Sequence, residues 1–251
     1  MNEKELVVKW KRDERAKFTG WDFSYLKGRW IEESPSWDYM KLAKYLVKNS
    51  SSVIDIETGG GERFCEIISR YKKKAVALEG YNPNVEVARK NLSRFSVKVV
   101  ETQKMNNLPF RNGEFDLILN RHGAINEKEF YRILNNDGIF LTQQVDGSNF
   151  SDLKKFFGVK SKFADITLMN VKKKLKKEGF TIMKTKQWTG KYIFYDVGAL
   201  VYYLKAIPFL VDGFSIETHI EYLKILQKKI EKKGKLEFIR KLFLIEARKL
   251  K

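Results

Sequence analysis

The feature that most constrains the fold is a short apolar run followed at once by a cluster of glycines. Residues 53–56 read as a buried strand, and the glycines at 59–61 open the next segment. An open α/β sheet forms a nucleoside-binding turn in this way, at the carboxyl end of a strand. Phe64 stands where a dinucleotide fingerprint has its third glycine, so the glycines alone do not identify the ligand.

Apolar runs alternate with amphipathic segments along the first 150 residues. Short strands are expected at 53–56, 75–78, 97–100, 115–119 and 139–141. This alternation predicts an α/β domain with a parallel sheet and crossover helices. Further along, a helix at 161–177, a strand at 180–185, an aromatic-rich insertion, a helix at 216–230 and strands at 236–239 and 242–247 are expected.

Composition excludes several classes of protein. The most apolar window, 197–211, is too short for a membrane span and contains Lys205 and Pro208. Cys65 is the single cysteine, which excludes an internal disulfide and a multi-cysteine zinc site, and no metal site is predicted. With no signal-peptide pattern in the first residues, a cytoplasmic protein without membrane partners is expected. The net charge of +18 fits either nucleic-acid binding or a lysine-rich surface.

Two acids at strand ends narrow the choice of ligand. Asp55 precedes the glycines, where an acid suits a cationic amino group better than a pyrophosphate. Glu79 ends the next strand, and its carboxylate can accept hydrogen bonds from the vicinal hydroxyls of a ribose. Together these positions indicate S-adenosylmethionine, with its amino-acid end near the first strand and its ribose near the second.

In these residues and the motifs around them, the chain resembles the class I S-adenosylmethionine-dependent methyltransferases, in particular a type 11-like branch, over about residues 50–150. The resemblance implies a Rossmann-like α/β fold. Its seven-stranded sheet is mostly parallel with an antiparallel last strand, and helices cover both faces. The motifs that carry it are Asp55-Ile56-Glu57-Thr58-Gly59-Gly60-Gly61-Glu62, Glu79-Gly80-Tyr81-Asn82-Pro83-Asn84, Leu108-Pro109-Phe110, Phe115-Asp116-Leu117-Ile118-Leu119-Asn120 and Leu134-Asn135-Asn136-Asp137-Gly138-Ile139-Phe140.

The resemblance also implies which residues contact the cofactor. Two positions depart from the family pattern. Glu57 replaces a glycine, so its carboxylate either pairs with the methionine ammonium or crowds it. Lys104 replaces an acid that often binds the adenine amino group, which leaves adenine to backbone groups, Gln103 or Met105. The expected cofactor contacts are Asp55, Glu57, Thr58, Gly59, Gly60, Gly61, Glu79, Gly80, Tyr81 and Asn120.

Methyl transfer from a sulfonium needs orientation of the acceptor more than it needs a base. His122, at the carboxyl end of the fourth strand, is the candidate base or orienting residue, or else a structural histidine under the cofactor. Arg121 either binds an anionic acceptor or pairs with an acid. No Asn-Pro-Pro-aromatic motif follows this strand, which argues against methylation of adenine N6 or glutamine.

Four segments are expected along the chain. Residues 1–49 form an N-terminal helical lid, 50–187 the Rossmann-like core, 188–235 a cap insertion and 236–251 the last strand of the core. Because an antiparallel last strand starts at the edge where ligands bind, the preceding insertion is expected to cover the site. The expected substrate or lid contacts are Trp21, Tyr25, Tyr195 and Tyr202.

The expected function is transfer of a methyl group from S-adenosylmethionine to nitrogen or oxygen of an acceptor. A small-molecule acceptor is favoured because no RNA-binding module is appended to the core. A methyltransferase of rRNA or tRNA is the alternative, which the basic charge supports. A protein that binds S-adenosylmethionine without transferring methyl groups is the third possibility, suggested by Glu57 and Lys104.

Overall fold

The computed structural model describes residues 2–18 and 21–250, so Lys251 of the expected last strand lies outside the described residues. The chain divides into two compact units. The first unit comprises Met1–Pro35, Gly147–Ala164 and Thr189–Lys241, and the second comprises Ser36–Asp146, Asp165–Trp188 and Leu242–Lys251.

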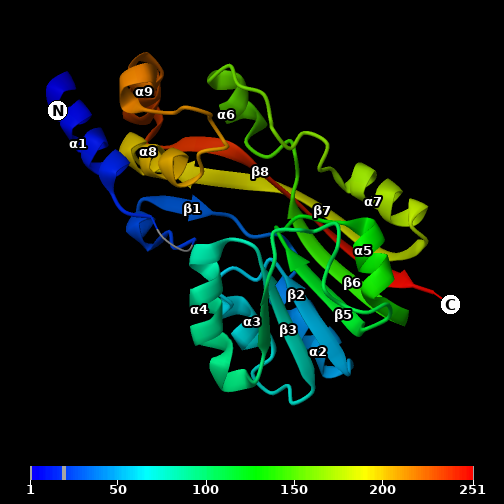
Figure 1. Cartoon of the computed structure of the whole chain (residues 1–251). Helices are drawn as coiled ribbons and strands as arrows, with labels where there is room; N and C mark the ends of the chain where they lie inside the picture. Colours follow the sequence, from blue (N-terminus) through cyan, green and yellow to red (C-terminus); the bar gives the residue numbers. More distant parts are fainter. Residues whose placement is uncertain (1, 19–20, 251) are drawn as a thin grey trace. The chain divides into compact units, whose positions relative to one another are not determined.

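The second unit contains the predicted parallel sheet (Figure 1). Its strands pair in the order β7-β8-β6-β5-β2-β3-β4. The pairs of β2 with β3 and β5, of β3 with β4 and of β5 with β6 are parallel, whereas β6 and β8 are antiparallel. The α/β class and the antiparallel last strand are therefore confirmed. The strands are β2 (Ser52–Ile56), β3 (Lys74–Glu79), β4 (Lys98–Glu101), β5 (Phe115–Arg121), β6 (Leu134–Val145), β7 (Phe180–Phe194) and β8 (Leu236–Lys249).

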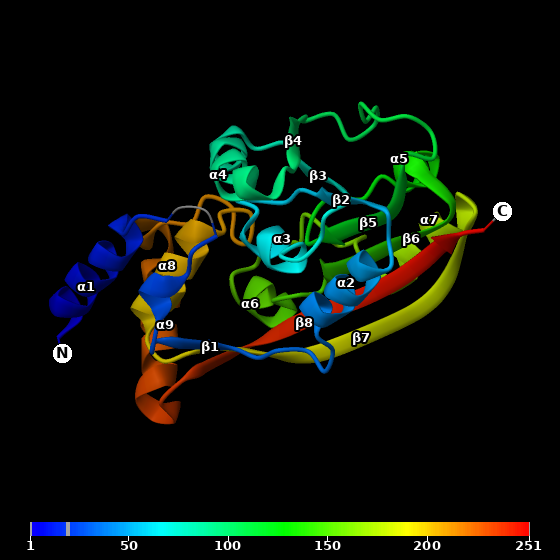
Figure 2. The same cartoon turned by 90° about the horizontal axis from the view of Figure 1, so that it is seen from below.

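Helices cover both faces of this sheet, as expected (Figure 2). Side chains alternate between faces along each strand. Val53 therefore packs with α2 (Tyr39–Lys48), α3 (Glu62–Ile67) and α4 (Asn82–Leu92). On the opposite face Ile54 packs with α5 (Glu127–Ile133) and α7 (Leu168–Lys177). Each such fully buried aliphatic side chain contributes roughly 1.5–3 kcal/mol to folding.

One strand was not expected from the sequence. β1 (Trp30–Glu32) pairs antiparallel with β7, between Trp30 and Phe194 and between Glu32 and Tyr192. This pairing gives the sheet eight strands instead of seven. It also extends β7 to Phe194, past the expected start of the insertion at residue 188.

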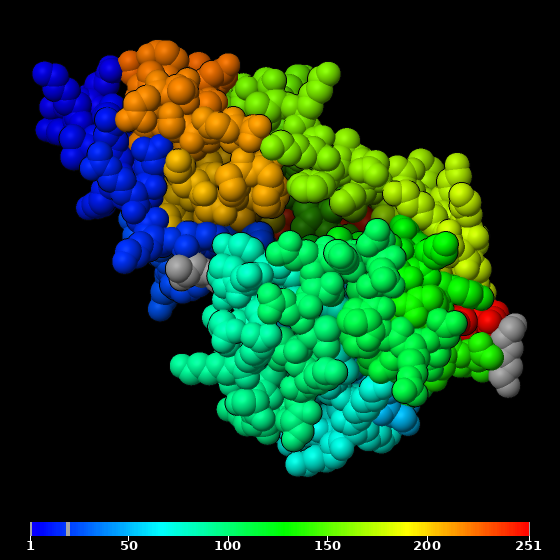
Figure 3. Space-filling model, in the orientation of Figure 1, coloured from blue at the N-terminus to red at the C-terminus, as the bar shows by residue number. Residues whose placement is uncertain are grey.

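The first unit consists mainly of helices packed on one core. They are α1 (Glu3–Arg15), α6 (Ser151–Phe156), α8 (Val197–Ala206) and α9 (Ile216–Lys233), with the short helix η1 (Ser24–Leu26). α1 packs against both α8 and α9, and its surface lies beside that of α9 in the space-filling view (Figure 3). No helix in the described part of the chain combines the length and apolarity needed to cross a membrane.

A buried ion cluster joins three parts of this unit. The carboxylate of Asp13 on α1 is fully buried and accepts bonds of 2.9 and 3.0 Å from Arg29 and of 2.7 Å from the Tyr25 hydroxyl. Arg29 also donates to Asp196, which caps the N-terminus of α8 by accepting from Ala199 N. A buried carboxylate needs such partners to offset its lost hydration.

The aromatic residues expected to contact substrate have different environments. Tyr202 is 2% exposed, stacks on Tyr25 at 4.5 Å between ring centroids and donates its hydroxyl proton to Lys17 O. Tyr202 is therefore a core residue, because α8 is buried around most of its circumference. Trp21 and Tyr195 are exposed, and their expected substrate contacts stay predictions.

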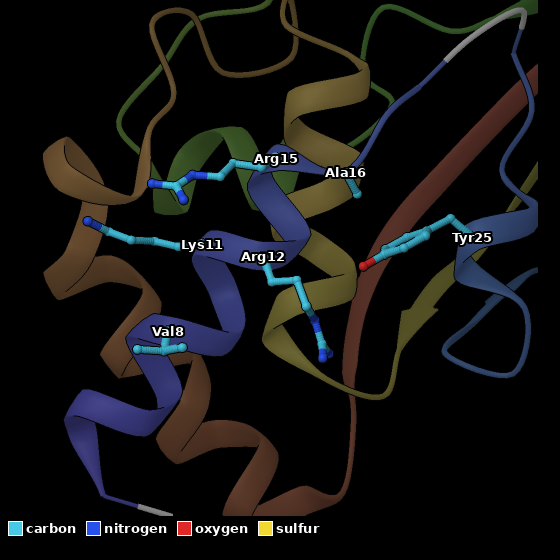
Figure 4. Close-up of a pocket in the computed structure, with 6 residues that line it drawn as sticks. All are labelled: Val8, Lys11, Arg12, Arg15, Ala16 and Tyr25. Carbon is cyan, nitrogen blue, oxygen red and sulfur yellow. The ribbon is translucent and has the colours of Figure 1, made fainter.

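A pocket of about 800 Å³ lies on the first unit, beside α1 and η1 (Figure 4). Its lining is basic on the α1 side, and Arg12 extends on the same side of the helix as the Tyr25 ring. Lys11 is engaged in an ion pair with Glu217 at 3.0 Å. The lining residues are Val8, Lys11, Arg12, Arg15, Ala16 and Tyr25.

Candidate cofactor site and active site

The glycine turn after β2 depends on left-handed backbone conformations. Gly59 and Gly61 have φ values of +64° and +79°. A Cβ atom on Gly61 would lie 2.9 Å from Leu92 Cδ1, so the absent side chain lets the turn pack on α4. A Cβ on Gly59 would meet nothing within 4 Å. The backbone is therefore open to a ligand at Gly59 and closed by protein at Gly61.

Asp55 lies at the carboxyl end of β2, beside this turn. Its Oδ2 accepts a hydrogen bond of 2.7 Å from the Thr58 hydroxyl. Burial raises the pKa of Asp55 to about 7, and the Glu79 carboxylate adds to the rise, while Thr58 and Arg121 oppose it. A cationic group bound beside this carboxyl would favour its ionised form and lower its pKa, so the carboxylate can pair with a cationic ligand.

Glu79 ends β3 and is 5% exposed. Its Oε2 accepts from Gly59 N at 2.6 Å, and its Oε1 accepts from Gly80 N and Tyr81 N, both at 2.9 Å. A carboxylate has about four acceptor positions. Backbone N–H groups of the two turns thus use three of these positions. One acceptor position remains for a ribose hydroxyl, instead of the two hydrogen bonds that were expected.

Glu57, the departure from the family glycine, adopts the left-handed conformation with φ +54°. Its Oε2 accepts a 3.0 Å bond from Ala124 N, in the loop that follows β5. Burial raises the pKa of the Glu57 carboxyl. The carboxylate therefore joins the cofactor turn to the loop at 121–124, a role that neither sequence-based reading of Glu57 included.

A network of buried side chains holds the loop at 121–124 in place. Asn120 is fully buried, donates to Ala124 O at 3.2 Å and accepts from Thr142 Oγ1 at 3.0 Å. Gln144 donates to both Asn120 Oδ1 and Gly123 O. The Asn120 amide is thus engaged inside the protein, and the expected contact of this residue with the cofactor stays a prediction.

His122 sits in this loop with φ +64° and is exposed. Its backbone N–H donates to Gln143 O at 2.8 Å. Its ring Nε2 lies 3.1 Å from Gln143 Nε2, and Gln143 Oε1 accepts from the indole N–H of Trp37 at 2.8 Å. Sequence reasoning missed Trp37 and Gln143, which lie far apart in the chain and belong to no shared motif.

Tyr39 is a second residue that sequence reasoning missed. Tyr39 is the first residue of α2 and is 6% exposed. Its hydroxyl has no hydrogen-bond partner among the described residues. Burial raises the pKa of Tyr39 well above its ordinary value, with a further contribution from the Asp55 carboxylate. An unpaired buried hydroxyl beside Asp55 is a polar group available to a ligand.

The segment expected near adenine is anchored by an ion pair. Arg132 donates to Glu129 Oε2 at 2.7 Å and to Leu108 O at 2.9 Å, and Glu129 accepts from Leu108 N. Gln103 and Lys104 are exposed and Met105 is half-buried, while Tyr81 is 64% exposed. The side-chain environments do not single out one adenine contact, and these assignments stay predictions.

The residues present fit S-adenosylmethionine at its amino-acid end and at the turn. Asp55 supplies an acid for an ammonium group, Tyr39 supplies an unpaired hydroxyl, and Gly59 leaves the backbone open. Glu79 offers a single further acceptor position next to the second turn.

Comparison with known proteins identifies this region. Residues 54–142 match the family model described as a methyltransferase domain. This match confirms the predicted class, the S-adenosylmethionine-dependent methyltransferases, for this part of the chain. No curated protein matches the sequence.

Solved structures show the same fold at low sequence identity. A candidate methyltransferase from Bacillus halodurans C-125 is 16% identical with a TM-score of 0.61, covering 85% of this chain and 99% of its own. A candidate sarcosine dimethylglycine methyltransferase from Galdieria sulphuraria is 13% identical, with a TM-score of 0.52 and coverages of 84% and 86%. A geranyl diphosphate methyltransferase in complex with S-adenosylmethionine is 13% identical, with a TM-score of 0.50 and coverages of 84% and 85%.

Proposed function

Because residues 54–142 form a class I methyltransferase domain, we propose that this chain transfers a methyl group from S-adenosylmethionine to nitrogen or oxygen of a small-molecule acceptor. The observation that carries the proposal is the grouping of Asp55, Tyr39 and the open backbone at Gly59 at the carboxyl end of β2. The single cysteine suits a reducing cytoplasm as the place of action.

Three side chains would each bind a different part of the cofactor. Asp55, ionised by its cationic partner, would receive the methionine ammonium, and the Tyr39 hydroxyl would donate to the methionine carboxylate. Glu79 would accept one ribose hydroxyl at its remaining position. The solved structure of geranyl diphosphate methyltransferase with S-adenosylmethionine supports this cofactor for the fold.

The cofactor, when bound, supplies a methyl group on a sulfonium, which is a good leaving group. A bond forms between the acceptor's nitrogen or oxygen and the methyl carbon, while the carbon–sulfur bond breaks and its electron pair stays on sulfur. The acceptor's proton leaves to solvent or to a base. The protein's main task is to hold the acceptor in line, which is the work of the loop at 121–124.

Tyr39→Phe tests the methionine end of the site. We expect the free energy of unfolding of the variant to equal that of the parent or to exceed it by up to about 1 kcal/mol, because an unpaired buried hydroxyl is removed. Binding of S-adenosylmethionine should weaken about tenfold through loss of one hydrogen bond to a charged group. Thermal unfolding and calorimetric titration measure the two effects. Unchanged affinity would remove Tyr39 from the site.

A methyltransferase acting on RNA is the second candidate, favoured by the net charge of +18 and by the basic pocket on α1. Against it, basic residues outnumber acidic ones in both units, so the excess of positive charge is not confined to one unit. Arg12→Glu with Arg15→Glu separates the two candidates. Salt-dependent binding of total RNA that this double variant loses would support RNA. Binding that is absent or insensitive to salt supports a small acceptor.

Transfer of label from methyl-labelled S-adenosylmethionine into fractionated cell extract tests the reaction itself. Label in the low-molecular-mass fraction is the result that we expect. Label in RNA would replace the small acceptor by the second candidate. Tight binding of the cofactor without any transfer would identify a binding protein that lacks the activity.

A further inference from the structure

Glu57 stands where the family pattern has glycine, and it keeps a backbone conformation that favours glycine. Its φ is +54°, in the left-handed region where a residue with a side chain is disfavoured. Such a conformation persists only where contacts around it hold it in place. The shape of the turn from Asp55 to Gly59 therefore depends on what binds the Glu57 side chain.

The loop at 121–124, which follows β5, supplies contacts that hold Glu57. Glu57 Oε2 accepts a hydrogen bond of 3.0 Å from Ala124 N. Gly123 leaves room for this side chain, because a Cβ atom there would lie 2.9 Å from Glu57 Oε2 and 3.0 Å from Glu57 Cβ. A carboxylate thus replaces the family glycine in the turn, and a glycine lies against it in the loop.

The strands beneath the loop bind its carbonyl groups. Asn120 Nδ2 donates to Ala124 O at 3.2 Å, and Gln144 Nε2 donates to Gly123 O at 3.0 Å. Glu57 accepts from the N–H of Ala124 instead, and so links the loop to the cofactor turn.

The turn and the loop therefore depend on each other. When the loop opens, Glu57 loses its partner, and its left-handed conformation loses that support. A cofactor that binds only the formed turn must in return disfavour opening of the loop, because coupling between two sites is reciprocal. The two segments follow β2 and β5, at the carboxyl edge of the sheet where ligands of open α/β sheets bind.

We propose that Glu57 is a positioning residue that couples the cofactor turn to the loop at 121–124, so that bound S-adenosylmethionine orders this loop. The inference rests on the proposed binding of the cofactor at the turn. It differs from both sequence-based interpretations of Glu57, because the carboxylate neither pairs with the methionine ammonium nor crowds it. Its hydrogen bond to Ala124 N instead transmits the state of the turn to the loop.

Hydrogen–deuterium exchange of the Ala124 amide, followed by NMR, measures the order of the loop. The reference amide is Ser50 N, which donates to Val47 O at 3.1 Å before β2. Without cofactor, Glu57→Gly should speed exchange at Ala124 about tenfold relative to Ser50, because the amide loses its acceptor. Glu57→Gln is the matched control, since its amide oxygen accepts the same bond, and exchange should stay within about threefold of the wild type.

The Glu57→Gly protein should remain folded. Relief of the left-handed strain offsets the lost hydrogen bond, so the midpoint of thermal unfolding should stay within about 4 °C of the parent. Faster exchange at Ala124 then reports a freed loop and not a general loss of stability.

Addition of S-adenosylmethionine tests the coupling. Each protein receives the cofactor at about 100 times its own dissociation constant, so that occupancy is equal. In the wild type and in Glu57→Gln, the cofactor should slow exchange at Ala124 at least about tenfold relative to Ser50. In Glu57→Gly the slowing should be less than about twofold, because the turn and the loop are no longer linked.

Two results would overturn the inference. One is equal exchange at Ala124 in the wild type and Glu57→Gly without cofactor. The other is a cofactor that slows this amide equally in both proteins, or in neither. If the wild type binds no S-adenosylmethionine in a calorimetric titration, the proposed function fails, and ordering by the cofactor fails with it. The comparison without cofactor still reports whether Glu57 holds the loop, so the two failures are distinguishable.

Discussion

Asp55→Asn should weaken the binding of S-adenosylmethionine about 100-fold, because a charge-assisted hydrogen bond to the ammonium contributes about 1.5–3 kcal/mol. The substitution preserves the shape of the side chain and its contact with Thr58. It also removes a carboxyl whose pKa burial raises to about 7, so the unliganded fold should not lose stability. Calorimetric titration of the two proteins at pH 7 measures the difference.

The same carboxyl predicts a dependence on pH. A cationic ligand binds the ionised form, so affinity should rise as the pH rises towards the Asp55 pKa of about 7. Between about pH 5.5 and pH 7 the gain should be about tenfold, below the range in which the cofactor's α-amino group loses its proton. Asp55→Asn should show no such rise.

Thr58→Val provides the matched control for this dependence. The Thr58 hydroxyl donates to Asp55 and lowers its pKa, so the rise in affinity should move to higher pH when that hydroxyl is lost. An equal pH dependence in wild type and Asp55→Asn would mean that another group receives the ammonium.

Glu79→Ala should cost both stability and binding. The carboxylate accepts hydrogen bonds from the N–H groups of Gly59, Gly80 and Tyr81. Loss of these three bonds should lower the free energy of unfolding by an amount on the order of 4 kcal/mol. Binding of S-adenosylmethionine should fall at least about 100-fold, since both turns lose their shared anchor along with the ribose acceptor. Denaturant unfolding followed by calorimetry measures the two quantities.

Glu101 provides the control for Glu79. It ends β4, directly beside Glu79 in the parallel pair, but it is exposed, and its carboxylate forms an ion pair with Arg89 at 3.2 Å. Glu101→Ala should change stability by less than about 0.5 kcal/mol and leave binding unchanged. A Glu79→Ala protein as stable as this control would show that the three backbone bonds contribute little.

The parallel sheet could be predicted because its strands carry strong local signals. β2 and β3 are nearly continuous apolar runs, with Asp55 next to the last residue of β2 and Glu79 at the end of β3, and they lie where the sequence indicated. β1 could not be predicted, because three residues have no periodicity and Trp30 pairs with Phe194, which is distant in sequence. Its strand forms only where β7 offers a free edge.

The candidate site was predictable in its residue types but not in its bonds. The sequence placed Asp55 and Glu79 at neighbouring strand ends, and the structure places them there. That Glu79 accepts three backbone bonds, and that Asn120 is buried under the loop, depends on turn geometry that composition does not encode. The contacts of Trp37 and Tyr39 depend on how α2 packs, which the motifs do not address.

Titration calorimetry of the intact chain tests most directly whether the turn between β2 and α3 holds S-adenosylmethionine. Saturable one-to-one binding of S-adenosylmethionine and of its demethylated product, weakened about 100-fold by Asp55→Asn, is the predicted result. Absence of binding by both compounds up to about 1 mM would show that this turn does not hold the cofactor.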